Sequence, residues 1–193
     1  MRSPRETGSG ALRGRRNNLP HELSLRLCAA SPKAYPDTSP LAMSITIRTY
    51  RDEDFKAVAA LEESGLHEPY RSAVFVRQMG EVCKETFFVA VTDGDEPVGY
   101  TVGAAVQHNI SEAWILRMGV RDDQRRKGIG SALLKSVTGA LQARHARTIR
   151  LSVSPENLPA IRLYEGQGFV QEKIIPAYFG EGEDRILMKK TRT

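Results

Sequence analysis

Six residues, Arg125-Arg126-Lys127-Gly128-Ile129-Gly130, combine three cations with two glycines, between an apolar run that ends at Val120 and a helical pattern that begins near Gly128. Glycine lets the backbone pass close to a ligand, and a helix N-terminus leaves N–H groups without partners. Together with the helix dipole such N–H groups bind anions, and the cations attract them from a distance. The chemistry predicted for residues 125–130 is therefore the binding of a polyanionic group such as a pyrophosphate.

Taken alone, this loop is also compatible with a surface turn that carries a solvated run of charge. Two nucleotide-binding alternatives are excluded by the residues themselves. No Gly-Lys-Ser/Thr step follows, as a nucleoside-triphosphate loop requires, and the chain has no G-x-G-x-x-G dinucleotide fingerprint. The loop needs a second motif before its ligand can be named.

That second motif is Asn157 to Phe169, which reads Asn-Leu-Pro-Ala-Ile-Arg-Leu-Tyr-Glu-Gly-Gln-Gly-Phe. A Gln/Arg-x-x-Gly-x-Gly/Ala loop followed by Asn…Ala…Leu-Tyr…Gly-Phe is the signature of the GNAT superfamily of N-acetyltransferases. The sequence resembles that superfamily over residues 45–190. The resemblance implies an enzyme in which a neutral amine attacks the thioester of acetyl-CoA. A non-enzymatic alternative is an acyl-CoA-binding regulatory module, against which stands the retention of Tyr164 beside an intact loop.

The resemblance also implies roles in cofactor binding. Main-chain groups of Met118 and Val120 would bind the pantetheine arm and the thioester as an added strand would, on a strand that carries a bulge which Gly119 could accommodate. N–H groups of residues 126–131 would bind the pyrophosphate, and Asn157 the pantetheine arm. The predicted cofactor-binding residues are Met118, Gly119, Val120, Arg125, Arg126, Lys127, Gly128, Ile129, Gly130, Ser131 and Asn157.

The resemblance makes Tyr164 the general acid that protonates the departing CoA thiolate; the alternative is a core aromatic residue on an amphipathic helix. No general base is evident. Related enzymes often carry Glu or His on the central strands, where this chain has Trp114 and Ser152. Glu112 and His108 lie near the start of the same strand and could act through water, although each is also a typical solvated hairpin residue.

The missing base bears on the acceptor, because only a neutral amine attacks a thioester. An N-terminal α-amine with a pKa of about 7.7–8.0 is roughly 10–15% neutral at pH 7, whereas a lysine with a pKa of about 10.4 is well under roughly 0.1% neutral. The difference in pKa corresponds to about 3.5 kcal/mol. A site without a strong base therefore favours an α-amine.

Two further stretches resemble archaeal protein N-terminal acetyltransferases and bacterial ribosomal-protein alanine acetyltransferases. Residues 175–188 are similar to their last hairpin, with its Tyr-Tyr…Gly-Glu-Asp-Ala…Met pattern, and Glu68-Pro69-Tyr70 is similar to their Pro-Tyr element between the first two helices. In those relatives both elements flank the peptide groove. Tyr70 and Tyr178 are therefore predicted to hydrogen-bond the substrate backbone, or alternatively to pack the loops.

This chain departs from the hairpin pattern at two positions, with Phe179 in place of the second Tyr and Arg185 in place of the usual Ala. Peptide entry is therefore expected to be narrower or tuned to acidic groups. The predicted acceptor is a protein or peptide N-terminal α-amine. Lysine, polyamine and other small-amine acetylation remain alternatives.

The elements that must position these residues follow from hydrophobic periodicity. Asp52 is expected to cap a first helix with Phe55, Val58 and Leu61 on its apolar face, and the face of the second helix is Val76, Met79 and Val82. Strands are predicted at residues 45–49, 86–91, 97–106, 112–120, 148–153, 169–175 and 184–189, and further helices at 72–83, from 128 and at 157–167. The order β-α-α-β-β-β-α-β-α-β-β is typical of an α/β fold. The GNAT resemblance implies a mixed, mostly antiparallel central sheet, flanked by helices and splayed between its fourth and fifth strands.

The net charge of +5 is located mainly in residues 1–42, which hold seven basic and three acidic side chains and leave +1 for residues 43–193. Residues 1–42 are predicted to form a disordered basic leader before an acetyltransferase domain at residues 43–193. Met43 could be the natural start, and an organelle-targeting peptide is the alternative. Since the basic excess lies outside the domain, no nucleic-acid partner is expected.

Two cysteines, Cys28 and Cys83, give neither metal-ligand spacing nor a disulfide framework, so no metal is expected. No apolar run approaches the roughly 20 residues that span a bilayer, so no membrane partner is expected. The chain is predicted to be cytoplasmic and either a monomer or a homodimer, with acetyl-CoA as its co-substrate.

Overall fold

The computed structural model describes residues 44–66 and 69–192. The predicted leader, Met43 and Glu68 lie outside the described residues. The elements are β1 (Thr46–Thr49), α1 (Phe55–Leu66), α2 (Pro69–Val82), β2 (Phe87–Val91), β3 (Pro97–Val106), β4 (Asn109–Val120), α3 (Ile129–Ala143), β5 (Thr148–Val153), α4 (Leu158–Gly166), β6 (Val170–Ile175) and β7 (Arg185–Thr191), with 3-10 turns η1 (Asp52–Asp54) and η2 (Asp122–Gln124). This order confirms the predicted one.

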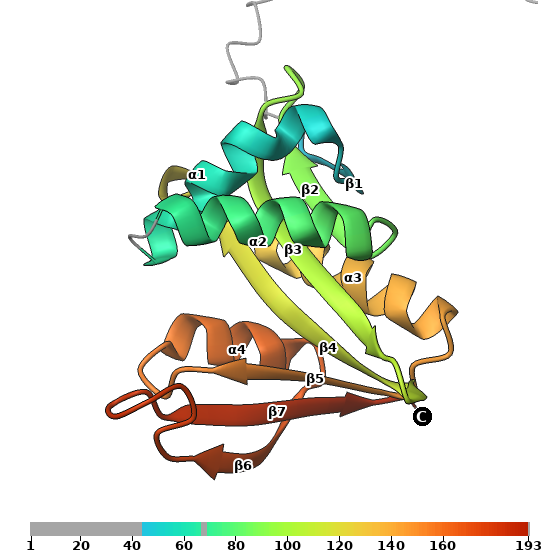
Figure 1. The fold of residues 1–193 in the computed structure, drawn as a ribbon, viewed down its shortest axis with the longest axis vertical. Helices are drawn as coiled ribbons and strands as arrows, with labels where there is room; N and C mark the ends of the chain where they lie inside the picture. The colour runs from blue at the N-terminus through green and yellow to red at the C-terminus, as the bar shows by residue number, and fades with distance from the viewer. Residues whose placement is uncertain (1–43, 67–68, 193) are drawn as a thin grey trace, which may run out of the picture. The chain divides into compact units, whose positions relative to one another are not determined.

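The strands form one sheet in the order β1-β2-β3-β4-β5-β7-β6, in which the β4–β5 pair is parallel and the other pairs are antiparallel. β4 and β5 pair only from Glu112 opposite Thr148 to Trp114 opposite Arg150, and then diverge. Figure 1 shows the two strands close at one end and far apart at the other. The predicted α/β class and the splay between the fourth and fifth strands are confirmed.

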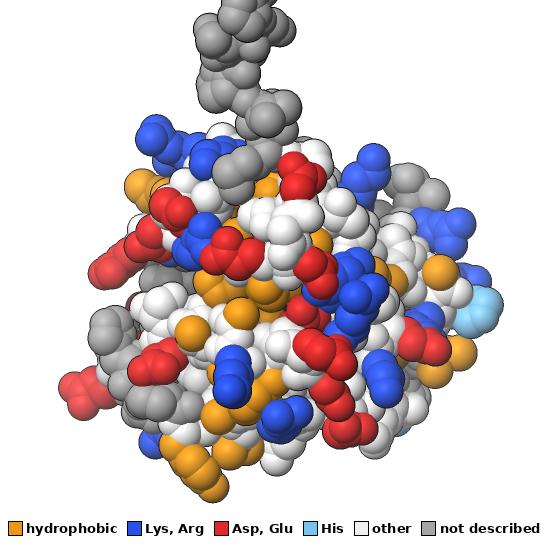
Figure 2. All heavy atoms as spheres, turned by 90° about the horizontal axis from the view of Figure 1, so that it is seen from above, with side chains coloured by type: hydrophobic (Ala, Val, Ile, Leu, Met, Phe, Trp, Pro, Cys, Tyr) orange, Lys and Arg blue, Asp and Glu red, His pale blue; other side chains and the backbone are white. Residues whose placement is uncertain are grey.

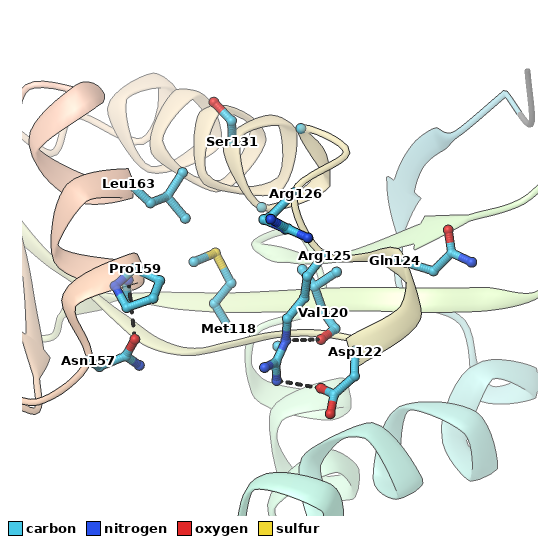
Figure 3. Close-up of a pocket in the computed structure, with 14 residues that line it drawn as sticks. Met118, Val120, Asp122, Gln124, Arg125, Arg126, Ser131, Asn157, Pro159 and Leu163 are labelled. Atoms are coloured by element: carbon cyan, nitrogen blue, oxygen red, sulfur yellow. Dashed lines mark hydrogen bonds and ion pairs between the residues drawn. The ribbon is translucent and has the colours of Figure 1, made fainter.

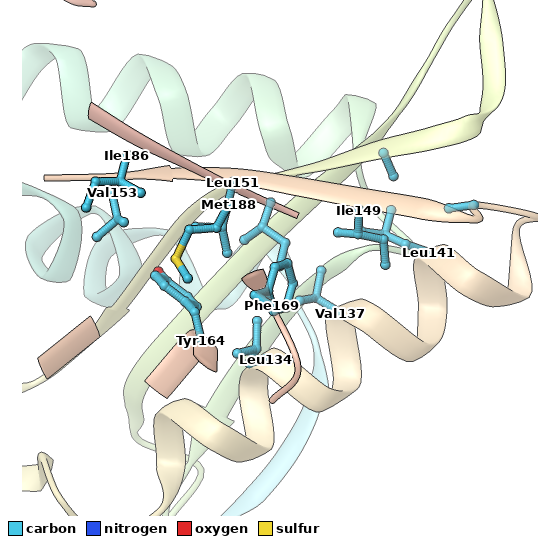
Figure 4. Close-up of a cluster of buried hydrophobic side chains, with 13 residues drawn as sticks. Leu134, Val137, Leu141, Ile149, Leu151, Val153, Tyr164, Phe169, Ile186 and Met188 are labelled. Atoms are coloured by element: carbon cyan, nitrogen blue, oxygen red, sulfur yellow. The ribbon is translucent and has the colours of Figure 1, made fainter. Parts of the chain in front are cut away.

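Helices cover both faces of the sheet, with α1 and α2 on one face and α3 on the other (Figure 1). The α1/α2 core consists of Tyr50, Val58, Val76, Cys83, Phe87, Val89, Val91, Tyr100 and Val102. The α3/α4 core, drawn in Figure 4, consists of Ala113, Ile115, Leu134, Val137, Leu141, Ala146, Ile149, Leu151, Val153, Tyr164, Phe169, Ile186 and Met188. Membership of one of these two cores therefore identifies the face of the sheet on which a side chain lies.

β4 carries the bulge expected in this strand, but not at Gly119. Gly119 pairs regularly with Tyr100, whereas the register shifts between the Val102–Arg117 and Gly103–Ile115 pairs, which leaves Leu116 as the extra residue. A Cβ at residue 119 would lie 2.8 Å from Cε1 of Tyr100. The small residue at 119 therefore makes room for the Tyr100 ring, which spacing alone could not show.

The turn before α1 also differs from the prediction, because Asp54, and not Asp52, accepts the hydrogen bonds that stabilise it. The buried Asp54 carboxylate accepts the Arg51 N–H at 2.8 Å and two Arg48 N–H groups at 2.7 and 2.8 Å. The predicted apolar position Val82, the last residue of α2, is 76% exposed, and Cys83, directly after the helix, is buried instead. Both differences come from tertiary packing that outweighs local periodicity.

Asp54→Ala should lower the free energy of unfolding by about 3 kcal/mol, because Arg48 is mostly buried and would lose its buried carboxylate partner, keeping only the exposed Asp95. Asp52→Ala is the matched control, since that carboxylate is 77% exposed and should change stability by less than about 0.5 kcal/mol. Urea unfolding of both variants measures the difference. A larger loss for Asp52→Ala would restore Asp52 as the helix cap.

No helix in residues 44–66 or 69–192 has both the length and the apolar character needed to cross a bilayer. Within the same residues, no cluster of three or more His, Cys, Asp or Glu side chains is suited to hold a metal ion. Figure 2 shows that acidic and basic side chains are interspersed on the face it displays.

Candidate active site

The divergence of β4 from β5 leaves one edge of β4 unpaired inside the sheet. The Arg121 N–H donates to the Val98 carbonyl at 2.9 Å, which fixes Val98–Arg121, and hence Tyr100–Gly119, as hydrogen-bonded pairs. The N–H and C=O groups of Met118 and Val120 therefore point away from β3 into the gap between β4 and β5. An extended ligand with amide groups can pair with this edge as another strand would.

The loop between β4 and α3 adopts the conformation that an anion site requires. Arg126 and Gly128 have φ angles of +61° and +81°, and Gly128 is the N-cap of α3. These turns present successive N–H groups at the helix N-terminus. Arg125 is held in the loop by hydrogen bonds to the Val120 carbonyl at 3.2 Å and to Asp122 at 2.6 Å (Figure 3), so its guanidinium also fixes the end of β4.

The unpaired edge and the loop line one cavity of about 620 Å³ on the α3/α4 face. Of the predicted cofactor-binding residues, nine line it: Met118, Gly119, Val120, Arg125, Arg126, Gly128, Gly130, Ser131 and Asn157. Two do not, since Ile129 is 3% exposed in a core cluster and the Lys127 ammonium donates to Gln124 at 3.0 Å. Of the three cations in the motif, Arg125 and Arg126 therefore line the cavity and Lys127 does not.

Five further residues line the cavity that the sequence analysis did not name: Asp122, Gln124, Pro159, Ala160 and Leu163. The three on α4 are spaced i, i+1 and i+4 and share one helical face. That spacing, on the helix that carries Asn157 and Tyr164, would have identified these three residues from the sequence.

Two polar side chains of the cavity have partners within the protein. Asn157 Oδ1 accepts the Ala160 N–H at 3.2 Å and caps α4, so its amide NH2 is the group left for a ligand (Figure 3). The Ser131 hydroxyl accepts from Gln167 at 2.7 Å and joins α3 to the end of α4. Because the Ser131 hydroxyl only accepts in this contact, its own O–H remains available as a donor.

Tyr164 lies on α4 with its ring in the α3/α4 core, edge-on to Phe169 at 6.0 Å between centroids. Its hydroxyl points toward Val153 at the end of β5 and Ile186 at the start of β7 (Figure 4) and has no hydrogen-bond partner among the described residues. Burial raises the pKa of Tyr164 to about 12. The structure therefore supports the core-aromatic alternative, and Tyr164 is not among the residues that line the cavity. Its hydroxyl stays protonated, and its role as general acid remains a prediction.

The raised pKa gives a pH prediction. The rate should rise until about pH 9, where an α-amine acceptor is about 90% neutral, and then stay level to pH 10, because Tyr164 keeps its proton below a pKa of about 12. A pH profile of kcat in stable buffers measures this. A decline centred near pH 10 that disappears in Tyr164→Phe would show that the phenol titrates at its ordinary value.

The structure does not bring the candidate bases to the cavity. Glu112 pairs with Thr148 where β4 and β5 are still joined, six residues or about 20 Å along the strand from Met118. Its carboxylate accepts from Arg150 at 2.6 Å. His108 is exposed in the turn between β3 and β4.

A carboxylate that the sequence analysis missed lies on the opposite face of β4. Glu62 of α1 is 4% exposed and accepts hydrogen bonds from the Tyr100 hydroxyl and from Arg117 Nε, the latter at 3.0 Å. Burial raises the pKa of Glu62, and Arg117 opposes that shift. Its position four residues after Val58, on the apolar face of α1, was the signal that this glutamate is buried.

The predicted substrate tyrosines face solvent. Tyr70 in the first turn of α2 is 80% exposed, and Tyr178 between β6 and β7 is 40% exposed and contacts the Phe179 ring at 4.7 Å. The Ala177 N–H donates to Asp184 at 2.9 Å across the β6–β7 connection. Tyr70 therefore does not serve to pack its loop.

A free strand edge, an anion site at a helix N-terminus and a protonated phenol suit an elongated ligand with amide groups, a pyrophosphate and a leaving group that needs a proton. These features define an acyl-CoA-dependent transferase. The model of the Acetyltransferase (GNAT) family matches residues 46–169. The chain belongs to this family, and acetyl-CoA is its co-substrate.

Known relatives agree with this assignment. The chain is 32% identical to an N-alpha-acetyltransferase of Sulfurisphaera tokodaii, over 74% of this chain and 90% of that protein. It is 28% identical to the [Ribosomal protein bS18]-alanine N-acetyltransferase of Escherichia coli, over 74% and 95%. Among solved structures, Ard1 from Thermoplasma volcanium matches with a TM-score of 0.69 at 29% identity, covering 77% of this chain and 98% of that one.

Proposed function

We propose that this protein acetylates the α-amino group of protein or peptide N-termini. The observation that carries the proposal is the unpaired β4 edge beside the anion loop, with neither Glu nor His at the two positions, Trp114 and Ser152, where the central strands would supply a base. An acceptor that is already partly neutral near pH 7 suits such a site better than lysine. The names of the relatives, which include N-alpha-acetyltransferases, support the same acceptor class.

The residues of the site have different roles in the proposed reaction. Main-chain groups of Met118 and Val120 hold the pantetheine arm in line, while N–H groups of the loop and of the first turn of α3 hold the pyrophosphate. Acetyl-CoA supplies the activated acyl group. The Tyr164 hydroxyl donates a proton to the departing thiolate, and solvent takes the proton that the acceptor nitrogen loses.

The acceptor enters from the α1/α2 face, because the cavity for the cofactor occupies the α3/α4 face. We propose that Tyr70 of α2 and Tyr178 of the β6–β7 connection, whose rings are exposed, contact the peptide backbone of the acceptor. We also propose that the acetylation takes place in the cytoplasm.

A CoA-release assay with the full chain, acetyl-CoA and a panel of short peptides tests the acceptor class. Peptides with free and blocked N-termini, each with and without an internal lysine, are compared with spermidine. Activity that requires the free α-amine supports the proposal. Activity that survives the block, or that is seen only with spermidine, assigns the enzyme to lysine or polyamine acetylation.

We also propose that residues 1–42 are a leader that the acetyltransferase domain does not need. A chain that begins at Met43 should keep the melting temperature and kcat/KM of the full chain, since the predicted core residues all follow it. Thermal unfolding and CoA release measure both quantities. A loss of either would show that the leader contributes to the fold or to the site.

A further inference from the structure

Two arginines lie on the α1/α2 face, one on each side of the gap between β4 and β5. Ile115 and Met118 pack toward the α3/α4 core, so the bulge at Leu116 turns both Leu116 and Arg117 to the opposite face. On β7, Ile186 belongs to the α3/α4 core, so Arg185 also lies on the opposite face. Arg117 and Arg185 therefore share the face by which the acceptor enters.

The strand register places the two arginines at similar depth in the gap. Trp114 and Arg150 are the last pair before β4 and β5 diverge, and Arg117 lies three residues beyond it on β4. Val153 pairs with Ile186, so Arg185 lies level with Ser154, four residues beyond Arg150. At about 3.3 Å per residue these positions are roughly 10 and 13 Å from the point of divergence.

Each arginine is held in the same manner, by one carboxylate and one aromatic ring. Arg117 donates from Nε to Glu62 at 3.0 Å and lies over the Phe75 ring at 5.3 Å. Arg185 donates from Nη2 to Glu183 at 2.6 Å and from Nη1 to the Asp184 carbonyl at 2.7 Å, and it lies over the Phe179 ring at 5.0 Å. A guanidinium has five N–H donors, so this arrangement fixes its plane and leaves donors for a ligand.

A third arginine on the same face shows what a purely structural role looks like. Arg150 is bound by Glu112 at 2.6 Å and by Glu172 at 3.0 Å, and Lys189 binds Glu172 at 3.2 Å. This network lies where β4 and β5 are joined and surrounds the Arg150 guanidinium with two carboxylates. Arg117 and Arg185 have one carboxylate partner each. The Arg117 side chain is 43% exposed, whereas Arg185 is 20% exposed, as Arg150 is, so Arg185 differs from Arg150 in its single carboxylate partner and in its position beside the gap.

We propose that Arg117 and Arg185 bind a carboxylate of the acceptor, so that the enzyme prefers N-termini with Asp or Glu as the first or second residue. Arg117 directly precedes Met118, whose main-chain groups hold the acyl donor, so an arginine side chain reaches the residues next to the reacting amine. Guanidinium groups bind carboxylates in a planar, two-bond geometry that amides match poorly. Glu62 is a positioning residue that fixes the plane of Arg117. This inference rests on the proposed acetylation of N-terminal α-amines.

The test compares peptides that differ only by Asp against Asn, or Glu against Gln, at residues 1 and 2. The full chain should show a kcat/KM ratio of acid to amide of about tenfold, equivalent to about 1.4 kcal/mol. Arg117→Gln and Arg185→Gln should each lower the ratio. Arg77→Gln is the matched control, because Arg77 also lies over a phenylalanine, Phe55, at 3.7 Å and beside the carboxylate of Asp52, but in α2 and outside the gap.

Glu62→Gln keeps an acceptor for Arg117 and removes the competing negative charge, so it should raise the acid-to-amide ratio, a change that a purely structural role would not cause. It also serves as the second variant if Arg117→Gln fails to fold. A ratio of one in the full chain, with both peptides acetylated, overturns the inference and leaves the proposed function intact. A ratio that persists in both arginine variants overturns it too, and no acetylation of any peptide overturns both proposals.

Discussion

Tyr164→Phe should lower kcat by roughly 10²- to 10⁴-fold, the usual range for a general acid, with little change in the dissociation constant for acetyl-CoA. The ring belongs to the α3/α4 core, so phenylalanine keeps the packing against Phe169. Only the hydroxyl is removed, and in the described residues it has no hydrogen-bond partner whose loss would destabilise the fold. The departing thiolate would then leave without a proton donor.

Tyr50→Phe is the matched control for this experiment. Tyr50 is also buried, its hydroxyl likewise has no partner among the described residues, and burial raises its pKa, but it lies in the α1/α2 core. Its substitution should leave kcat unchanged. Single-turnover kinetics should accompany the steady-state assay, because slow product release would conceal a slower chemical step. Equal single-turnover rates for Tyr164→Phe and the parent would remove Tyr164 from the acid role.

Gly130→Leu should weaken acetyl-CoA binding by roughly 30-fold or more, equivalent to about 2 kcal/mol of steric conflict. Gly130 lines the cavity in the first turn of α3, and a Cβ there would lie 3.2 Å from Leu163 Cδ2 and 4.0 Å from Val120 Cγ2. A larger side chain must therefore extend into the space beside the N–H groups that are proposed to bind the pyrophosphate. Calorimetric titration with acetyl-CoA measures the change.

Gly139→Leu separates this effect from helix stability. Gly139 lies in the same helix, and a Cβ added to it would have no neighbouring atom within 4 Å, so leucine there extends into open space. Leucine forms helices better than glycine by about 1 kcal/mol, so this control should unfold at a higher temperature and bind acetyl-CoA normally. Similar binding by both leucine variants would show that the first turn of α3 is not the pyrophosphate site.

The fold could be predicted from sequence because its signals are local. The predicted bounds of β5 equal the observed ones, since alternate residues of Thr148–Val153 are buried, and the long apolar stripe of α3 identifies that helix. The anion loop could be found because glycine marks a backbone conformation that other residues rarely adopt. Gly128, at a φ of +81°, is such a position.

The features that could not be predicted from the sequence depend on contacts between residues that are far apart in the chain. Glu62 and Arg117 are 55 residues apart, and no local pattern indicates that they meet. The bulge at Leu116 has no glycine on β4 itself to mark it, because the register is set by the pairing of β3 with β4. Similarly, Asp52 and Asp54 are equivalent as helix-start signals, and the burial of Arg48 beside Asp54 distinguishes them.

The gap between β4 and β5 makes the stability of the protein depend on its ligand. Three residue pairs join these strands, so the rest of this β4 edge forgoes the interstrand hydrogen bonds that a continuous sheet would have. In the proposed binding mode acetyl-CoA would supply that missing partner, and binding to the folded state alone would add about 2.7 kcal/mol to stability at a concentration 100 times the dissociation constant. The lifetime of the folded chain in a cell would therefore follow the supply of acetyl-CoA, and a starved cell would hold a less stable enzyme.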